Sequence, residues 1–185
     1  GRFSIPDLRV DPQQGEIVFK ANGETPTVLE LLDHEPLGYI QSVGLRPDFL
    51  GGTAEGDFLL TMPLLADLKF DQIKLKGAAR LNDALGANLV GALEVAGGSL
   101  DVSLNEHALE AKGEISIKGV PAEISWQRIF NTPDAQQAPI QVTARLDAAA
   151  REQLGIKVNH LVQGPTPVTL RIARLGAETP TVMNL

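Results

Sequence analysis

The central stretch of the chain, residues 93–126, alternates between apolar and polar positions with a period of two. This period is typical of antiparallel strands with one apolar and one solvated face. The pattern divides into four strands, near 89–95, 100–104, 109–117 and 120–126. The apolar face carries Leu93, Val95, Leu100, Val102, Leu104, Leu109, Ala111, Gly113, Ile115, Ile117, Val120, Ala122, Ile124 and Trp126. We therefore expect an antiparallel meander whose apolar face needs a cover.

The turns between these strands, at 96–99, 105–108 and 118–119, agree on one register. A one-residue slip in any of them would move the apolar residues of a strand to the other face. The predicted inner pairs are Val95–Leu100, Leu93–Val102, Leu104–Leu109, Val102–Ala111, Ile117–Val120, Ile115–Ala122, Gly113–Ile124 and Ala111–Trp126. On the outer face Lys112 is expected opposite Asp101, and Glu114 opposite Glu123.

Further strands are predicted on both sides of the meander. The residues that mark them are Phe3 and Ile5, Leu8 and Val10, and Ile17 and Phe19, then Phe58, Leu60 and Met62, and finally Val168, Leu170 and Ile172. A strand is also expected over Ile140–Leu146. A long strand over 68–81 changes parity, which predicts a β-bulge at Asp71-Gln72. It is expected to pair Leu81 with Leu89, Ala79 with Gly91, Gly77 with Leu93 and Leu75 with Val95.

Two segments favour helices. In residues 27–43, Thr27 and Glu30 predict a capping box, and Val28, Leu31 and Leu32 share a face. Pro36 is expected to begin a second helical piece that carries Leu37, Ile40 and Val43 and stops at Gly44. In residues 147–154, Asp147 is the expected N-cap, with Gly155 just after the last turn.

Composition narrows the possible partners. The chain of 185 residues has 43% hydrophobic residues but only 4% aromatic ones, so its apolar surface is mainly aliphatic. A net charge of −7 without a basic run argues against nucleic acid and against a polybasic membrane contact. The absence of cysteine excludes disulfides and thiol chemistry. The chain begins with Gly-Arg-Phe rather than Met, so we expect residues 1–185 to be one domain excised from a longer protein.

No motif predicts catalysis, a metal or a cofactor. His34, His107 and His160 have no partners at metal-ligand spacing. The glycines of GGTAEG precede a strand, so they do not place a phosphate at a helix N-terminus, and GxSxG is missing. We therefore expect a protein that is not an enzyme. Trp126 is either an aromatic anchor at the mouth of a groove or, as the favoured alternative, a core residue over Ala111 and Gly113.

The chain resembles the periplasmic domain of AsmA-like proteins. The resemblance rests on LLDHEPLGYIQSVGL, GGTAEGDFLLTMPLL, DLKFDQIKLKGAARL, LEAKGEISIKGVPAEISW and DAAAREQLGI, and on a Gly-Pro before the last strand. It covers most of residues 3–175 and is carried by pattern and a few fixed residues, without a catalytic motif. It implies a repeating β-groove, or bridge-like, lipid transfer protein of the Gram-negative envelope, folded like a taco around an aliphatic lumen. It also implies an N-terminal inner-membrane anchor in the full-length protein.

These observations lead to one expectation and one alternative. We expect a mainly β fold, a curved antiparallel meander forming a taco-like or half-barrel groove with two short helical segments. The groove would bind a phospholipid or another acyl chain in the periplasm, for phospholipid transport or outer-membrane homeostasis. Its expected lipid-facing residues are Leu93, Val95, Leu100, Val102, Leu104, Leu109, Ala111, Ile115, Ile117, Val120, Ile124 and Trp126. The alternative is a structural or assembly module whose helices plug the sheet. Exposed edge strands could also self-associate.

Overall fold

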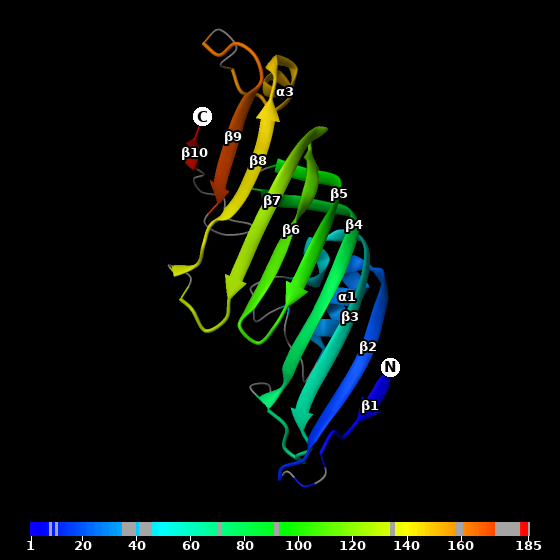
Figure 1. The fold of residues 1–185 in the computed structure, drawn as a ribbon. Coiled ribbons are helices and arrows are strands. Elements are labelled where there is room, and N and C mark those ends of the chain that lie inside the picture. Colours follow the sequence, from blue (N-terminus) through cyan, green and yellow to red (C-terminus); the bar gives the residue numbers. More distant parts are fainter. Residues whose placement is uncertain are drawn as a thin grey trace.

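The computed structural model describes residues 1–7, 9, 11–34, 40, 46–69, 72–90, 93–133, 136–157, 161–172 and 182–184. Its ten strands form one antiparallel sheet in which each strand pairs with the next one along the chain (Figure 1). The strands are β1 (Arg2–Ser4), β2 (Gln14–Glu24), β3 (Gly51–Pro63), β4 (Lys74–Val90), β5 (Leu93–Leu104), β6 (Ala108–Ile117), β7 (Val120–Ile129), β8 (Ile140–Leu146), β9 (Thr166–Ile172) and β10 (Val182–Asn184).

Two short helices, α1 (Thr25–Asp33) and α3 (Ala148–Gln153), and the 3₁₀ turn η1 (Pro47–Phe49) complete the described elements. The predicted mainly β antiparallel meander with two short helices is therefore confirmed. The sheet is open and not curled, with β1 and β10 at its opposite edges (Figure 1). Because the two helices cover parts of the apolar face, that face is buried without closure of the sheet on itself.

The predicted register is confirmed in the hairpins β5–β6 and β6–β7. The inner pairs are Leu104–Leu109, Val102–Ala111, Ala111–Trp126, Gly113–Ile124, Ile115–Ala122 and Ile117–Val120. Outer residues Asp101 and Lys112 also lie opposite each other, as do Glu114 and Glu123. Lys118 and Gly119 both have positive φ, 48° and 80°, which is the conformation that a two-residue hairpin turn with matching twist requires.

The hairpin predicted at residues 96–99 is wrong, because β5 is one continuous strand. Val95 lies opposite Ile117, and Gly98 opposite Ile115, so β5 has one extra residue at this point. Gly97 and Gly98, with φ of 92° and 128°, form this β-bulge. A bulge reverses the inward parity of a strand just as a turn does. For this reason Val95 and Leu100 share a face although they are not partners.

The predicted pairing of the long strand with residues 89–95 is wrong for the same reason. Once β5 extends to Leu104, it pairs with β4 over its whole length. The observed partners are Gly77–Leu104, Ala79–Val102 and Leu81–Leu100. The strand itself begins at Lys74 rather than at Leu68, which lies in the β3–β4 connection. The predicted bulge at Asp71-Gln72 falls partly outside the described residues.

Helix α1 begins two residues before the predicted capping box. Its N-cap is Glu24, whose side chain makes no capping hydrogen bond. Pro26 explains the early start, since proline fixes a helical φ and needs no hydrogen bond in the first turn. Val28 and Leu32 are buried as predicted, whereas Leu31 is 50% exposed. The predicted second helical piece lies outside the described residues, except for the buried, helical Ile40.

Helix α3 is confirmed with its caps. The Asp147 carboxylate accepts a hydrogen bond from the Ala150 backbone N–H (2.8 Å), and Gly155 has a φ of 77°. The helix packs on a small cluster formed by Val120, Leu146 and Val168, which join the ends of β7, β8 and β9.

Strands β7 and β8 are paired over only three positions, Glu123–Ser125 with Gln141–Thr143. Beyond Ser125 the two strands separate, and the side chain of Gln137 takes the place of a partner strand. Its Nε2 donates to the Ile129 carbonyl (2.7 Å), and its Oε1 accepts from the Ile129 N–H (2.9 Å).

Candidate functional site: an apolar cavity beneath α1

A cavity of about 140 Å³ lies between α1 and the inner face of β3–β7. The residues around it come from α1, from the segment that precedes β3, and from five consecutive strands. They are Thr25, Val28, Leu29, Leu32, Ile40, Leu50, Ala54, Phe58, Gly77, Ala79, Leu81, Ala84, Val95, Leu100, Val102, Leu104, Leu109, Ala111, Ile115, Ile124 and Trp126. None of these side chains is charged, and Thr25 is the only one with a hydrogen-bonding hydroxyl.

The register of the sheet explains why space remains under the helix. One row of opposed residues crosses six strands and consists mostly of small side chains, in the order Ala21, Gly56, Ala79, Val102, Ala111 and Trp126. Interiors are normally packed to a density that leaves few voids larger than a water molecule. Because the side chains of this row are small up to Trp126 at its end, they leave unfilled space between the sheet and α1.

The aromatic pair Phe19 and Phe58 borders this row. The two rings are stacked, with centroids 5.3 Å apart and an interplanar angle of 19°. Phe58 reaches over Gly77, where a Cβ atom would overlap the ring. Gly77 is therefore required for the position of Phe58, which forms part of the cavity wall.

Most of the predicted groove residues meet at this cavity. Those that line it are Val95, Leu100, Val102, Leu104, Leu109, Ala111, Ile115, Ile124 and Trp126. Ile117 belongs to the same apolar cluster without lining the cavity, and Val120 packs instead in the separate cluster beneath α3. The side chain of Leu93 lies outside the described residues. Trp126 packs partly buried against the apolar core, as the core interpretation expects. It also lines the cavity, as the interpretation as an aromatic anchor expects.

Sequence reasoning missed the contribution of the N-terminal half. Ala54 and Phe58 of β3, and Leu81 and Ala84 of β4, complete the floor. The alternation in β3 was visible, but its register with β4 was not. Like the bulge in β5, an extra residue at Asp83, with a φ of 51°, changes the parity of β4 and brings Leu81 and Ala84 to one face.

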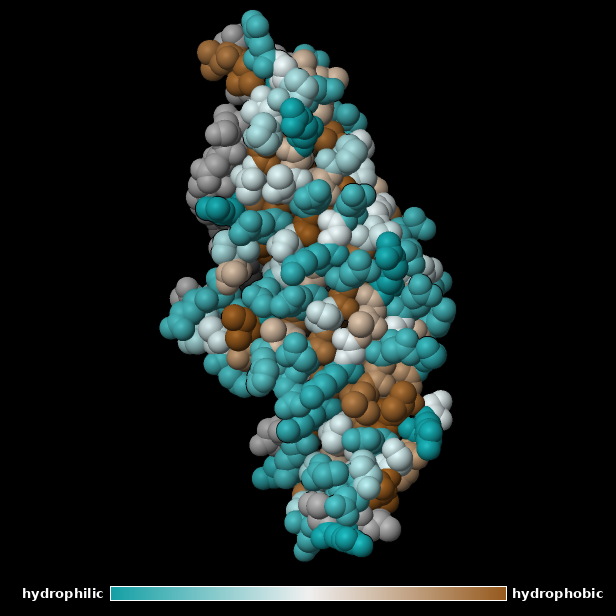
Figure 2. Space-filling model, in the orientation of Figure 1, coloured by the Kyte–Doolittle hydropathy of each residue, from teal (hydrophilic) through white to brown (hydrophobic). Residues whose placement is uncertain are grey.

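The opposite face of the sheet is polar (Figure 2), with hydrophilic side chains predominating over β4–β7. Ion pairs join neighbouring strands there, between Lys20 and Asp57 (2.6 Å) and between Arg80 and Asp101 (3.3 Å). These pairs are largely exposed and contribute little stability individually. The sheet therefore has one solvated face and one face suited to apolar contact.

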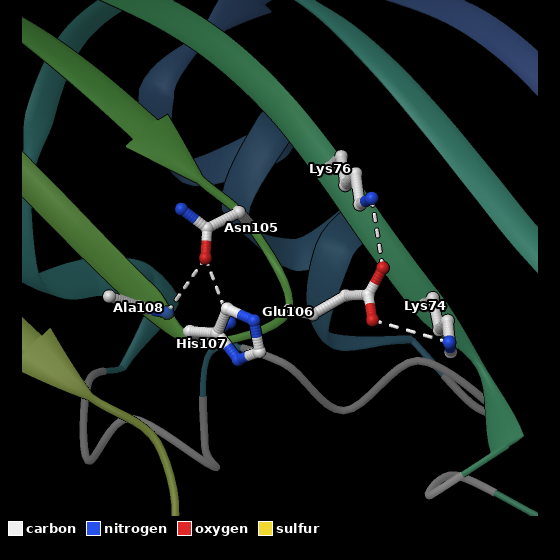
Figure 3. A network of polar contacts seen from close by, with 6 residues as sticks. All are labelled: Lys74, Lys76, Asn105, Glu106, His107 and Ala108. Atoms are coloured by element: carbon white, nitrogen blue, oxygen red, sulfur yellow. Dashed lines mark hydrogen bonds and ion pairs between the residues drawn. The ribbon is translucent and has the colours of Figure 1, made fainter.

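A polar network joins the β5–β6 hairpin loop to β4 (Figure 3). Glu106 bridges Lys76 (2.9 Å) and Lys74 (3.2 Å), and these two ammonium groups hold its pKa below the ordinary value of 4.5. In the same loop, Asn105 Oδ1 accepts hydrogen bonds from the backbone N–H groups of His107 (2.8 Å) and Ala108 (3.1 Å). The network shapes the turn and lies on the surface.

Within the part of the chain that the structure describes, no three His, Cys, Asp or Glu side chains gather as metal ligands. His34 and His107 belong to separate elements, and His160 lies outside the described residues. No helix among the described residues is long and apolar enough to span a membrane. No protein-family model, curated protein or solved structure matches the chain.

Proposed function

We propose that this protein is a non-enzymatic, lipid-binding module of the Gram-negative cell envelope. The single observation that carries the proposal is the cavity beneath α1, whose described lining residues are uncharged and mostly aliphatic. Aliphatic contact is non-directional and contributes about 0.8 kcal/mol for each CH₂ group removed from water. Such a wall suits a fluid acyl chain better than a ligand with many polar groups.

The size of the cavity limits the ligand. An engineered apolar cavity of about 150 Å³ binds benzene in another protein. At about 140 Å³, the cavity beneath α1 accommodates a segment of one acyl chain and not both chains of a phospholipid. A longer segment enters if α1 moves away from the sheet.

The resemblance to AsmA-like proteins supports the cellular setting. On that basis we propose a periplasmic location, an inner-membrane anchor in the full-length protein, and a role in phospholipid transport or outer-membrane homeostasis. Edge-strand self-association through β1 or β10 stays a prediction, which light scattering of the purified chain would test.

The alternative is a structural or assembly module whose apolar face is plugged. One observation favours it: several residues around the cavity, among them Val95 and Ile115 at 4% exposure each, are buried by other parts of the chain. The two functions differ in what the purified protein carries.

The test is to purify the chain, extract it with organic solvent and identify any acyl species by mass spectrometry. The delipidated protein is then titrated with a fluorescent fatty acid. Co-purified acyl chains, or saturable binding of the probe, are expected for the lipid-binding module. A chain that carries no lipid and binds neither the probe nor a hydrophobic dye would be the structural module.

A further inference from the structure

The hydroxyl group of Thr25 is an unpaired polar atom at the wall of the apolar cavity. Thr25 is the first residue of α1, and its side chain is fully buried at 0% exposure. Among the residues that the structure describes, its Oγ1 has no hydrogen-bond partner. Because buried hydroxyls are nearly always hydrogen-bonded in native proteins, this one requires an explanation.

The location of Thr25 provides the explanation. The other described side chains around the cavity are hydrocarbon, apart from the indole of Trp126, so these side chains offer the hydroxyl no partner. A valine would fill almost the same volume without the cost of an unsatisfied polar atom. Oγ1 exchanges position with the methyl group through rotation between staggered χ1 rotamers, so the hydroxyl can meet an occupant of the cavity.

We propose that the cavity binds a chain that bears one uncharged oxygen, which is a hydroxyl or an ester or amide carbonyl. Thr25 Oγ1 forms a hydrogen bond with this oxygen. This inference rests on the proposed function. The oxygen is uncharged because none of the described side chains around the cavity would neutralise a carboxylate or phosphate, and an unpaired buried charge is very costly. The positive end of the α1 dipole, where Thr25 lies, favours an oxygen that accepts a hydrogen bond.

The experiment compares n-hexanol and n-heptane, which are chains of equal length with and without an oxygen. Both are titrated into the full chain and into Thr25→Val and Thr25→Ser, with Trp126 fluorescence and methyl chemical shifts as readouts. We expect Thr25→Val to weaken n-hexanol binding about tenfold, the worth of one hydrogen bond to a buried partner. We expect n-heptane binding to stay equal or improve, and Thr25→Ser to retain the alcohol preference.

A second measurement does not depend on ligands. If the hydroxyl has no hydrogen-bond partner in the folded chain, Thr25→Val raises the melting temperature, whereas loss of a structural hydrogen bond lowers it. A lowered melting temperature, or equal effects of Thr25→Val on both probes, would overturn the role of Thr25. Neither outcome would contradict the proposed binding of acyl chains in the cavity. If neither probe binds the wild-type chain, the proposed function fails together with this inference.

Discussion

Ala79 of β4 lies directly opposite Gly56 of β3, and a Cβ atom on Gly56 would be only 2.8 Å from the methyl group of Ala79. The two strands therefore carry very little side-chain volume where they pass beneath α1. Ala79 lines the cavity, while its neighbour Ala78 is exposed on the opposite face. This pair of adjacent alanines allows the cavity to be filled with a matched control.

Ala79→Leu should abolish ligand binding while the protein stays folded. The added carbon atoms occupy the space that an acyl chain would need, and we expect at least a tenfold loss of affinity for a fluorescent fatty acid. Because the cavity accommodates the larger side chain, the stability should change by less than about 1.5 kcal/mol. Ala78→Leu should bind the probe like wild type. Equal losses in the two variants would place the binding site elsewhere.

Ile115→Glu places a carboxylate in the cavity wall, at a position with 4% exposure. We expect loss of acyl ligand and a destabilisation of roughly 2–4 kcal/mol at pH 7, measured by urea unfolding. Ser116→Glu, one residue further along β6, should cost no more than about 0.5 kcal/mol. If Ile115→Glu cannot fold and the wild-type chain carries no lipid, the plugged structural module is the better description.

The same variant should show a defined pH dependence. Burial raises the pKa of a carboxyl group above its unfolded value of about 4.3, so the folded state holds the proton more tightly. The part of the penalty that comes from ionisation is then absent well below the unfolded pKa and grows as the pH rises through the unfolded pKa towards the folded one. A penalty that is constant from pH 4 to pH 7 would mean that the introduced carboxylate reaches solvent.

The two glycines of the β5 bulge should differ in their tolerance of alanine. Both have positive φ, but a Cβ at Gly97 meets no atom within 4 Å, whereas a Cβ at Gly98 would overlap the Glu114 carbonyl oxygen. We expect Gly97→Ala to cost roughly 1 kcal/mol through backbone strain alone, and Gly98→Ala roughly 3 kcal/mol or more. Chemical denaturation of both variants measures the difference. Equal costs would contradict the bulge geometry.

The Glu106 network should make a small, pH-dependent contribution to stability. Its pKa is lowered in the folded state by Lys76 and Lys74, so the contribution is present above the unfolded pKa and is lost as the pH falls through the folded pKa. Glu106→Gln should lower the melting temperature at pH 7 in low salt and make no difference at pH 2. Glu94→Gln, at an exposed position on β5, is the control. High salt should reduce the effect of Glu106→Gln because the network lies on the surface.

The inner faces of most strands were predictable from the sequence, because alternation reports directly which residues are buried, but the bounds of β4 and β5 were not. The hairpins with strong turn signals were also predictable in register, as Lys118-Gly119 illustrates. The register of β4 with β5 was not, since a bulge and a turn both reverse parity and leave the same apolar pattern. Gly97-Gly98 suits either, and the choice depends on pairing with distant strands.

The candidate site was predictable only in part. Its floor follows from the alternation in β5–β7, which supplied Val102, Ala111 and Ile115. The cover depends on where α1 packs, and neither hydrophobic pattern nor propensity fixes that position. The sequence does not show that small residues of β3 and β4 lie side by side, because this depends on cross-strand pairing. Gly56 and Ala79 are an example. Thr25 was not singled out because an unpaired hydroxyl is a property of packing and not of sequence.

The side-chain amide of Gln137 affects how the sheet meets other molecules at high protein concentration. Where β8 leaves β7, the Ile129 N–H and C=O would be open to a strand from another molecule. The amide presents both a donor and an acceptor, like one peptide unit of a neighbouring strand, and occupies both groups. A single side chain therefore blocks pairing of a foreign strand at Ile129, the end of β7.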